Sequence, residues 1–223
     1  MAEGEDMATT TLGVREPVAD DSRTDILLAA ADCFMERGYA ATSVDDVARR
    51  LGATKGRIYH HFPSKADLFT GVFRHGMDRI YAAVEPYRNM PGPAVERWKK
   101  IAFVHTVRMM RSKTLARVVW EGVEMHLRGA TTPEQRVVLA DLVQYRNGYS
   151  DIFRRTISQA RDEGDFDFDD VAITVQSMFM ALNSPIFWYV PRDGETEEHV
   201  TGIAKQIVTF AYRGLGGKGE LNL

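Results

Sequence analysis

Residues 47–62 read VARRLGATKGRIYHHF, and this stretch decides the fold of the first part of the chain. It predicts two short helices joined by a tight turn at Gly52, because glycine readily takes the left-handed conformation that ends a helix. Two helices joined in this way are typical of a helix-turn-helix. Between Asp46 and Asp67 the chain has five basic residues and no carboxylate, although its net charge is −3. A positive patch on an acidic chain indicates that a polyanion docks at one place.

The composition is typical of a soluble globular protein, with 223 residues, 44% of them hydrophobic and 26% charged. The first residues are acidic and have no apolar core, so we expect no secretory signal. The most apolar stretch, 178–190, contains polar residues and a proline, and we expect it to be buried core, too short to cross a bilayer. The single cysteine, Cys33, excludes an internal disulfide and a cysteine-based zinc cluster. We therefore expect a cytoplasmic protein with no membrane partner.

Capping residues and helical spacing predict four helices in the first part of the chain. Each expected start is a serine or threonine, whose hydroxyl can accept hydrogen bonds from the free N–H groups of a first turn. Ser22 also has Asp25 three residues later, in the position of a capping box. The expected starts and ends are Ser22 and Gly38, Ser43 and Gly52, Thr54 (or Ala53) and His61, and Ser64 and Pro86.

The rest of the chain is also expected to be helical. Apolar residues follow helical spacing in five further stretches: 94–111, 114–128, 132–163, 169–189 and 196–212. The third of these begins with Thr132 and Pro133, a capping residue before a proline, and would be about 45 Å long. No stretch alternates with the period of a strand. We therefore predict an all-α fold, with a three-helix helix-turn-helix head on a larger helical body and about nine helices in all.

The run 23–69 resembles the DNA-binding domain of the TetR family of transcriptional regulators. Many residue types match at fixed spacing: Gly38-Tyr39, Thr42-Ser43-Val44, Asp46-Val47-Ala48, Leu51-Gly52, Thr54-Lys55-Gly56, Ile58-Tyr59, His61-Phe62 and Ser64-Lys65. Beyond about residue 80 the resemblance extends only through helix order and length. We accordingly divide the chain into a disordered arm (1–21), a DNA-binding domain (22–68), a ligand-binding and dimerisation domain (69–215) and a flexible tail (216–223).

The recognition helix of such a domain presents its first turn to base edges and its flanks to phosphates. Lys55 and Arg57 can donate to guanine O6 and N7. Gly56 between them removes side-chain bulk, and Thr54 can meet a base edge or a thymine methyl. The family's phosphate contacts correspond to Thr42 or Ser43, Tyr59, His61 and Lys65, with His60 as a further contact.

Some of these residues have simpler interpretations. The alternative for Tyr59 is packing against the first helix. A metal pair of His60 and His61 is unfavourable, because adjacent helical residues point about 100° apart and no cysteine or acid lies nearby, so we expect no metal and no cofactor. Arg49 and Arg50 are interpreted as solvated surface residues rather than specific contacts.

The resemblance implies that the body binds a small molecule and forms a homodimer. The stretches 169–189 and 196–212 each have a regular apolar stripe, and two such helices can meet their copies in a four-helix interface. The alternative is that both stripes are buried within the monomer. Two-fold symmetry would place two recognition helices about one turn of DNA apart on a near-palindromic double-stranded operator.

Candidates for the ligand pocket are apolar, aromatic and polar residues of the middle helices, because pockets combine apolar walls with a few convergent polar groups. We single out Trp98, Phe103, Met109, Trp120, Met125, Tyr145, Arg146, Tyr149, Phe179, Asn183 and Trp188. The alternative for each apolar residue is ordinary core, and for each polar residue a satisfied core or surface group.

Three short motifs are similar to a subgroup of the family that senses acyl-CoA thioesters: Tyr145-Arg146-Asn147, Gly164-Asp165-Phe166 and Phe187-Trp188-Tyr189-Val190-Pro191. This likeness implies that aromatic side chains hold the acyl part and that basic groups meet the CoA phosphates. A neutral hydrophobic drug or metabolite is the competing effector.

The function expected from these features is a ligand-responsive repressor, which a small hydrophobic effector releases from its operator. An enzyme is the second hypothesis, but the sequence has no Gly-x-Ser-x-Gly elbow, P-loop or His-Glu-x-x-His motif. The third hypothesis is an interaction module whose body binds another protein.

Overall fold

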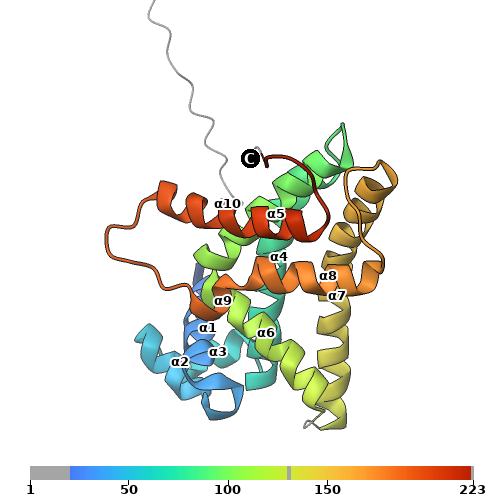
Figure 1. The fold of residues 1–223 in the computed structure, drawn as a ribbon. Helices are drawn as coiled ribbons and strands as arrows, with labels where there is room; N and C mark the ends of the chain where they lie inside the picture. Colours follow the sequence, from blue (N-terminus) through green and yellow to red (C-terminus); the bar gives the residue numbers. More distant parts are fainter. Residues whose placement is uncertain (1–20, 130–131, 222–223) are drawn as a thin grey trace, which may run out of the picture.

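Helices make up all of the regular structure in the computed structural model, which describes residues 21–129 and 132–221. They are α1 (Asp21–Ala41), α2 (Val44–Leu51), α3 (Lys55–His61), α4 (Lys65–Arg88), α5 (Ala94–Arg111), α6 (Lys113–Arg128), α7 (Pro133–Asp162), α8 (Val171–Asn183), α9 (Pro185–Trp188) and α10 (Glu197–Gly214). Because α9 is a single turn, these described ranges contain nine longer helices, and they contain no strand. The predicted all-α fold is confirmed, and Figure 1 shows α1–α3 as a small head at one end of a larger helical body. The predicted arm, apart from its last residue, lies outside the described residues.

The turn between α2 and α3 depends on Gly52. This residue has φ 61° and ψ 31°, the left-handed conformation that the sequence predicts, and its N–H donates to the carbonyl of Arg49 over 3.2 Å. Any residue with a Cβ would be strained there by about 1–2 kcal/mol. The glycine therefore allows α3 to start only a few residues after α2 ends.

Short polar side chains begin several helices, as predicted. At α2 the Ser43 hydroxyl accepts from the Asp46 N–H over 3.2 Å, and the Asp46 carboxylate accepts from the Ser43 N–H over 2.9 Å. This pair satisfies two of the free donors of the helix start. Side chains accept in the same way at the starts of α4, α7, α8 and α10, from Ser64, Thr132, Asp170 and Thr196.

Three predicted helix ends are wrong. Ser22 does not cap α1, because the helix begins one residue earlier. Pro86 does not end α4, which continues to Arg88, since a missing N–H near the end of a long helix costs only one backbone hydrogen bond. The predicted helix 169–189 is divided at Pro185 into α8 and α9, again because proline cannot donate within the helix.

The stretch Val171–Trp188 is long and apolar enough, by length and composition alone, to cross a membrane. This stretch begins earlier than 178–190, the stretch to which the sequence-based expectation applied. The expectation of buried core holds in part: Met178, Phe179 and Leu182 are buried, whereas Met180, Phe187 and Trp188 are exposed. Its exposed apolar side chains lie on α8 and α9, which with α10 cover one face of the body (Figure 1).

Two apolar cores meet where α6 packs against α4. The core of the head includes Leu115 and Val118 of α6 as well as Phe69 of α4, whereas Phe73, one turn further along α4, belongs to the core of the body. A Cβ atom added at Gly122 of α6 would lie 2.8 Å from the Phe73 ring. The glycine therefore lets α6 approach α4 closely enough to close both cores.

Candidate nucleic-acid interface and ligand cavity

The four predicted base readers lie together on the exposed start of α3, which comprises Thr54, Lys55, Gly56 and Arg57. Thr54 precedes the helix, and its side chain makes no capping hydrogen bond. Protein atoms do not crowd Gly56, because an added Cβ would meet only the Thr54 hydroxyl oxygen, at 3.8 Å. The glycine is thus not required by packing; it leaves the surface flat between two cations.

The two cationic readers are held by the protein itself. Lys55 Nζ lies 2.5 Å from Asp45 Oδ2, and the Arg57 guanidinium donates to Ser22 Oγ over 3.1 and 3.2 Å. Exposed polar pairs of this kind are worth about 0–1 kcal/mol, so exchanging them for DNA partners costs little. The role of Ser22 escaped the sequence analysis, because it lies 35 residues from Arg57 and no local pattern connects them.

The end of α3 presents further polar side chains. Tyr59 is 47% exposed, so part of its side chain is accessible to a phosphate. His60 is exposed, and His61 Nε2 lies 3.4 Å from Ser22 Oγ. Within the described ranges no three histidine, cysteine, aspartate or glutamate residues are grouped to hold a metal ion.

Thr42 and Ser43, which the sequence analysis offered as alternatives, differ in exposure. Thr42 is 2% exposed, and its hydroxyl donates to the Gly38 carbonyl over 2.8 Å. Its side chain therefore closes the break at the end of α1 and does not face solvent. Ser43 is exposed, so of the two only its side chain is accessible to a phosphate.

Lys65 is engaged inside the protein. Its ammonium group donates to the carbonyls of Tyr39 (2.8 Å), Ala40 (3.3 Å) and Thr42 (2.9 Å), and it lies 4.4 Å from the centre of the Tyr39 ring. These carbonyls follow the break in α1 at Gly38, where helical partners are missing. Lys65 thus ties the start of α4 to the end of α1, a role that the expected phosphate contact did not include.

The basic residues of α2 form ion pairs with acidic neighbours. Arg49 and Arg37 both pair with Asp46, over 3.1 and 2.8 Å, and Arg50 pairs with a carboxylate of α1. Hydrogen bonds from Ser43 hold the pKa of the Asp46 carboxyl well below its usual range. This network fixes α2 against α1 and agrees with the interpretation of Arg49 and Arg50 as surface residues.

The body has a partly open cavity of about 70 Å³ between α4, α5, α6, α7, α8 and α9. Six of the eleven predicted pocket residues line it: Met109, Trp120, Arg146, Tyr149, Phe179 and Asn183. The remaining lining residues, which the sequence analysis did not single out for this site, are Met77, Ile80, His105, Ala116, Val119, Val123 and Ile186.

The other five predicted pocket residues lie elsewhere. Trp98 is completely buried in the body core, where its indole N–H points at Met178 Sδ over 3.3 Å. Tyr145 stacks on Tyr81 and its hydroxyl donates to Asp78 over 2.5 Å. Phe103 lies beside the contact between α5 and α10. Met125 lines a separate pocket together with Tyr39 and Phe69, and Trp188 is 53% exposed.

A chain of three polar side chains crosses one wall of the cavity. Asn183 Oδ1 can only accept, so the His105 Nε2–H donates to it over 2.8 Å, and His105 Nδ1 accepts from the Tyr149 hydroxyl over 2.8 Å. Burial lowers the pKa of His105 to about 4 and raises that of Tyr149 well above its usual value. His105 is therefore a neutral imidazole at physiological pH. His105 was not among the predicted pocket residues, because its partners lie 44 and 78 residues away and no local pattern connects them.

A larger open groove of about 570 Å³ shares a wall with this cavity. The wall is built by neighbouring residues: Ile80 and Tyr149 face the cavity, while Tyr81 and Gly148 face the groove. The groove is lined mainly by polar groups and includes three arginines, Arg88, Arg97 and Arg155, and one carboxylate, Asp151. Arg88 pairs with Glu85, and Arg97 donates to Gln159.

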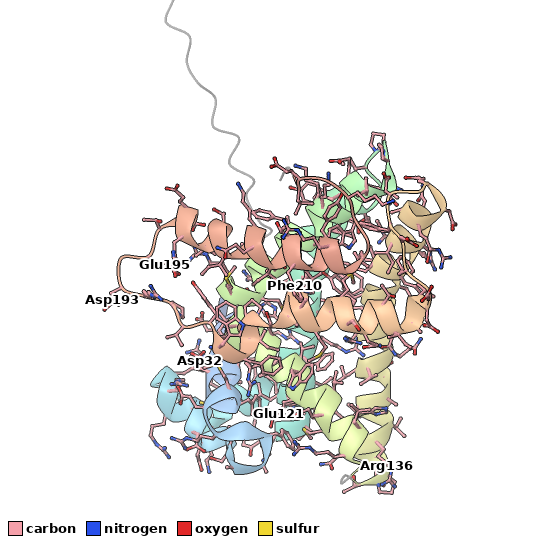
Figure 2. All side chains as sticks on the ribbon, in the orientation of Figure 1. Asp32, Glu121, Arg136, Asp193, Glu195 and Phe210 are labelled. Atoms are coloured by element: carbon pink, nitrogen blue, oxygen red, sulfur yellow. The ribbon has the colours of Figure 1, made fainter. Side chains whose placement is uncertain are left out.

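The head is joined to the body by a second face of α6. The Glu121 carboxylate accepts from the backbone N–H of Tyr39 over 2.6 Å, and burial raises the pKa of Glu121 (Figure 2). Tyr39 directly follows Gly38, whose φ of 76° breaks the path of α1. The end of α1 is therefore fixed to the same helix that lines the cavity.

An exposed recognition helix with cations at its start, joined to a helical body with an interior cavity, defines a DNA-binding regulator with room for a small ligand. Comparison with known families agrees: residues 26–72 match "Bacterial regulatory proteins, tetR family", and residues 91–215 match "Tetracyclin repressor-like, C-terminal domain". The chain belongs to the TetR family of transcriptional regulators, whose members are not enzymes.

Individual relatives show how far the similarity reaches. The repressor KstR2 of Rhodococcus jostii (strain RHA1) is 25% identical over 208 residues, covering 89% of this chain and 96% of that protein. The activator FasR of Mycolicibacterium smegmatis is 37% identical over 65 residues, 29% of this chain and only 30% of that protein. The structure of KstR2 of Mycobacterium tuberculosis has a TM-score of 0.73 at 21% identity, covering 92% of this chain and 98% of that one. AibR in complex with isovaleryl coenzyme A and operator DNA has a TM-score of 0.65 at 24% identity, covering 83% and 97%. These structural likenesses show the fold.

Replacing Arg57 by alanine tests base reading. We expect this change to weaken binding to a cognate operator by about 1–3 kcal/mol and to relax specificity at the contacted base pair. The measurement is fluorescence anisotropy on operator and random duplexes, with Arg49→Ala as a control that removes a charge from α2. Equal losses on operator and random DNA for Arg57→Ala would remove Arg57 from the base readers.

Replacing Lys65 by alanine separates its two roles. If Lys65 ties α4 to α1, its replacement removes hydrogen bonds to a charged group, each worth up to about 3 kcal/mol. The variant should then unfold at a lower temperature than the wild type. A phosphate contact predicts a different result: unchanged stability and a salt dependence of DNA binding that is shallower by about one ion. Thermal unfolding and anisotropy over a range of salt concentrations distinguish the two.

Lowering the pH should destabilise the fold through His105. Its folded-state pKa of about 4 lies below the ordinary 6.5, so the unfolded chain binds the proton more readily. The stability due to neutral His105 is complete above pH 6.5 and is lost between pH 6.5 and 4, by about 2 kcal/mol from pH 7 to 5. Urea unfolding of the wild type and of His105→Gln at both pH values measures the difference. An equal loss of stability in both proteins would contradict the assignment.

Proposed function

We propose that this regulator is a cytoplasmic repressor, which binds a near-palindromic operator as a homodimer and is released by a small hydrophobic effector held in the cavity. The observation that supports this most directly is the double role of α6. Ala116, Val119, Trp120 and Val123 line the cavity, and Glu121 and Gly122 contact the end of α1 and the α4 helix. Movement of α6 by a ligand would therefore reach the reading head.

The size of the cavity supports release by displacement. A volume of about 70 Å³ is far below the 300–1,000 Å³ of ordinary ligand pockets, so a ligand larger than a few atoms has to move its walls. α6 cannot yield toward α4, because Gly122 already lies against the Phe73 ring. The displacement is instead transmitted along α6 to Glu121 and Tyr39. Effector and operator then oppose each other through one coupling free energy, typically about 1–3 kcal/mol.

The proposed dimer interface is the face formed by α8, α9 and α10. Large apolar side chains are exposed there, and Phe210 of α10, which is 72% exposed, is the most accessible of them (Figure 2). The others on this face are Ile173, Met180, Phe187 and Trp188. An exposed apolar face of this size indicates a partner surface, and a second copy of the chain meets it with the same residues under two-fold symmetry. The two copies of α3 would then reach successive major grooves.

The specific effector that we propose is an acyl-CoA thioester, with a neutral hydrophobic metabolite as the alternative. The cavity offers an apolar end for an acyl group, and the groove behind the shared wall offers Arg88, Arg97 and Arg155 for phosphates. Because the cavity lies between helices rather than on an open apolar surface, it favours a small molecule over a protein partner.

The test uses the purified protein and an operator selected by it from random DNA. Hexanoyl-CoA, hexanoate and hexanol are compared by thermal shift, which detects ligands that bind the folded state, and by anisotropy on the operator. We expect at least one compound to raise the melting temperature and to lower operator affinity about 5–150-fold. If none of them changes operator affinity, release by a small hydrophobic effector is refuted.

Glu121→Ala tests the connection between cavity and head. The variant should still bind the effective compound, but the drop in operator affinity that the compound causes should fall to less than about one-third of the wild-type drop, because the Tyr39 N–H loses its partner on α6. Glu124→Ala is the matched control, since Glu124 lies one turn away on α6 and makes only a surface ion pair with Arg128 (3.6 Å). An undiminished response in Glu121→Ala would show that coupling follows another route.

A further inference from the structure

Arg146 of α7 is the only charged residue among those that line the cavity. It is partly buried, and its guanidinium carbon lies 5.6 Å from the centre of the Phe179 ring. No carboxylate lies within ion-pair distance of it among the residues that the structure describes, and it makes no hydrogen bond to them. Burial lowers the pKa of Arg146. The cavity therefore contains a cation without a counter-ion.

Two other arginines of α7 have carboxylate partners, whereas Arg155, which is exposed, has none among the described residues. Arg154 pairs with Asp151 over 3.2 Å, and Arg161 lies 3.7 Å from Asp162. Arg161 also lies over an aromatic ring, that of Phe168, at 5.1 Å. Arg161 and Arg146 thus share a helix and a ring contact, but only Arg161 has a carboxylate. Because Arg146 has no protein counter-ion, a bound anion would supply one without displacing an existing ion pair.

The surroundings of Arg146 define the size and charge of that anion. His105 supplies no second positive charge, because hydrogen bonds to Tyr149 and Asn183 occupy both of its ring nitrogens and it is neutral. No aspartate or glutamate lines the cavity to offset Arg146. The site therefore has a net charge of about +1 in a small volume, which suits a singly charged, planar group. A carboxylate has this charge and shape, and it pairs with guanidinium through two parallel hydrogen bonds.

We infer that the effector carries a carboxylate, which binds Arg146, and an apolar part, which lies against Met77, Met109 and Trp120. This inference rests on the proposed function only in taking the cavity as the effector site. The carboxylate has two chemical sources: a free hydrophobic acid, or a CoA thioester of a dicarboxylic acid whose second carboxylate enters the cavity. A simple acyl-CoA has no such group, nor has a neutral metabolite.

The experiment compares ligands that differ only in this group. Hexanoate, hexanol, hexanamide, hexanoyl-CoA and the CoA monothioester of hexanedioic acid are titrated calorimetrically into the wild type, Arg146→Met, Arg146→Lys and the matched control Arg161→Met. We expect the wild type and Arg161→Met to bind one or both carboxylate-bearing ligands about 10–100-fold more tightly than their uncharged counterparts. Arg146→Met should lose this preference. Arg146→Lys should keep part of it, because a single ammonium retains the charge but not the two-point geometry.

The unliganded variants give a second, independent readout. Arg146→Met should melt at a higher temperature than the wild type, because it removes an unpaired, partly buried charge and keeps a side chain of similar length. Arg161→Met should not. If Arg146→Met melts at a higher temperature than the wild type, misfolding cannot explain its loss of preference for the carboxylate ligands.

Different outcomes would overturn the carboxylate inference and the proposed repressor function. Equal affinity for hexanol and hexanoate, or a carboxylate preference that survives in Arg146→Met, would overturn the carboxylate site. If hexanol or hexanoyl-CoA alone binds and releases the operator, the proposed repressor remains and the inference fails. If hexanoate binds through Arg146 without lowering operator affinity, the site is real and release by this ligand is refuted. Preference for the dicarboxylic thioester over hexanoate identifies CoA as part of the effector.

Discussion

The close packing of α6 against α1 and α4 is the contact on which the rest of the structure depends. Gly122 admits the Phe73 ring, so that one helix closes the core of the head and the core of the body. One turn of α6 holds the backbone of Tyr39 through Glu121, and the opposing side chains border the cavity. Because packed helices shift as units rather than deform locally, a change at the cavity has a direct route to the reading head.

The head shows how a DNA-reading surface is kept ordered without DNA. Its two reading cations, Arg57 and Lys55, are paired with Ser22 and Asp45, weak surface partners that phosphates or base edges can replace at small cost. Lys65 belongs to a different class, since three carbonyls engage its ammonium group. The first set is available for binding, and the second maintains the break in α1 on which the position of α2 depends.

The cavity combines a satisfied polar group with an unsatisfied one. His105 is buried and neutral, and both of its ring nitrogens are hydrogen-bonded, so it stabilises the cavity wall and has no free group to bind a ligand. Arg146 lies against the Phe179 ring, and no carboxylate among the cavity-lining residues balances its positive charge. Because of this contrast, Arg146 determines which charged group the effector has to carry, although several aromatic residues line the same cavity.

The sequence by itself determined the helix-turn-helix and most of the helices and caps, because these depend on residues a few positions apart, such as Ser43 with Asp46 and the left-handed Gly52. It also indicated the exposed readers of α3, whose pattern is local. It misplaced the start of α1 and the end of α4. Only the tertiary structure decided which candidates share a cavity, because that space is formed by side chains from six helices. Trp98 and Arg146 were both candidates, but Trp98 lies in the body core and Arg146 lines the cavity. The roles of Ser22, Lys65 and His105 were likewise decided by partners 23 to 78 residues away, which no local spacing reveals.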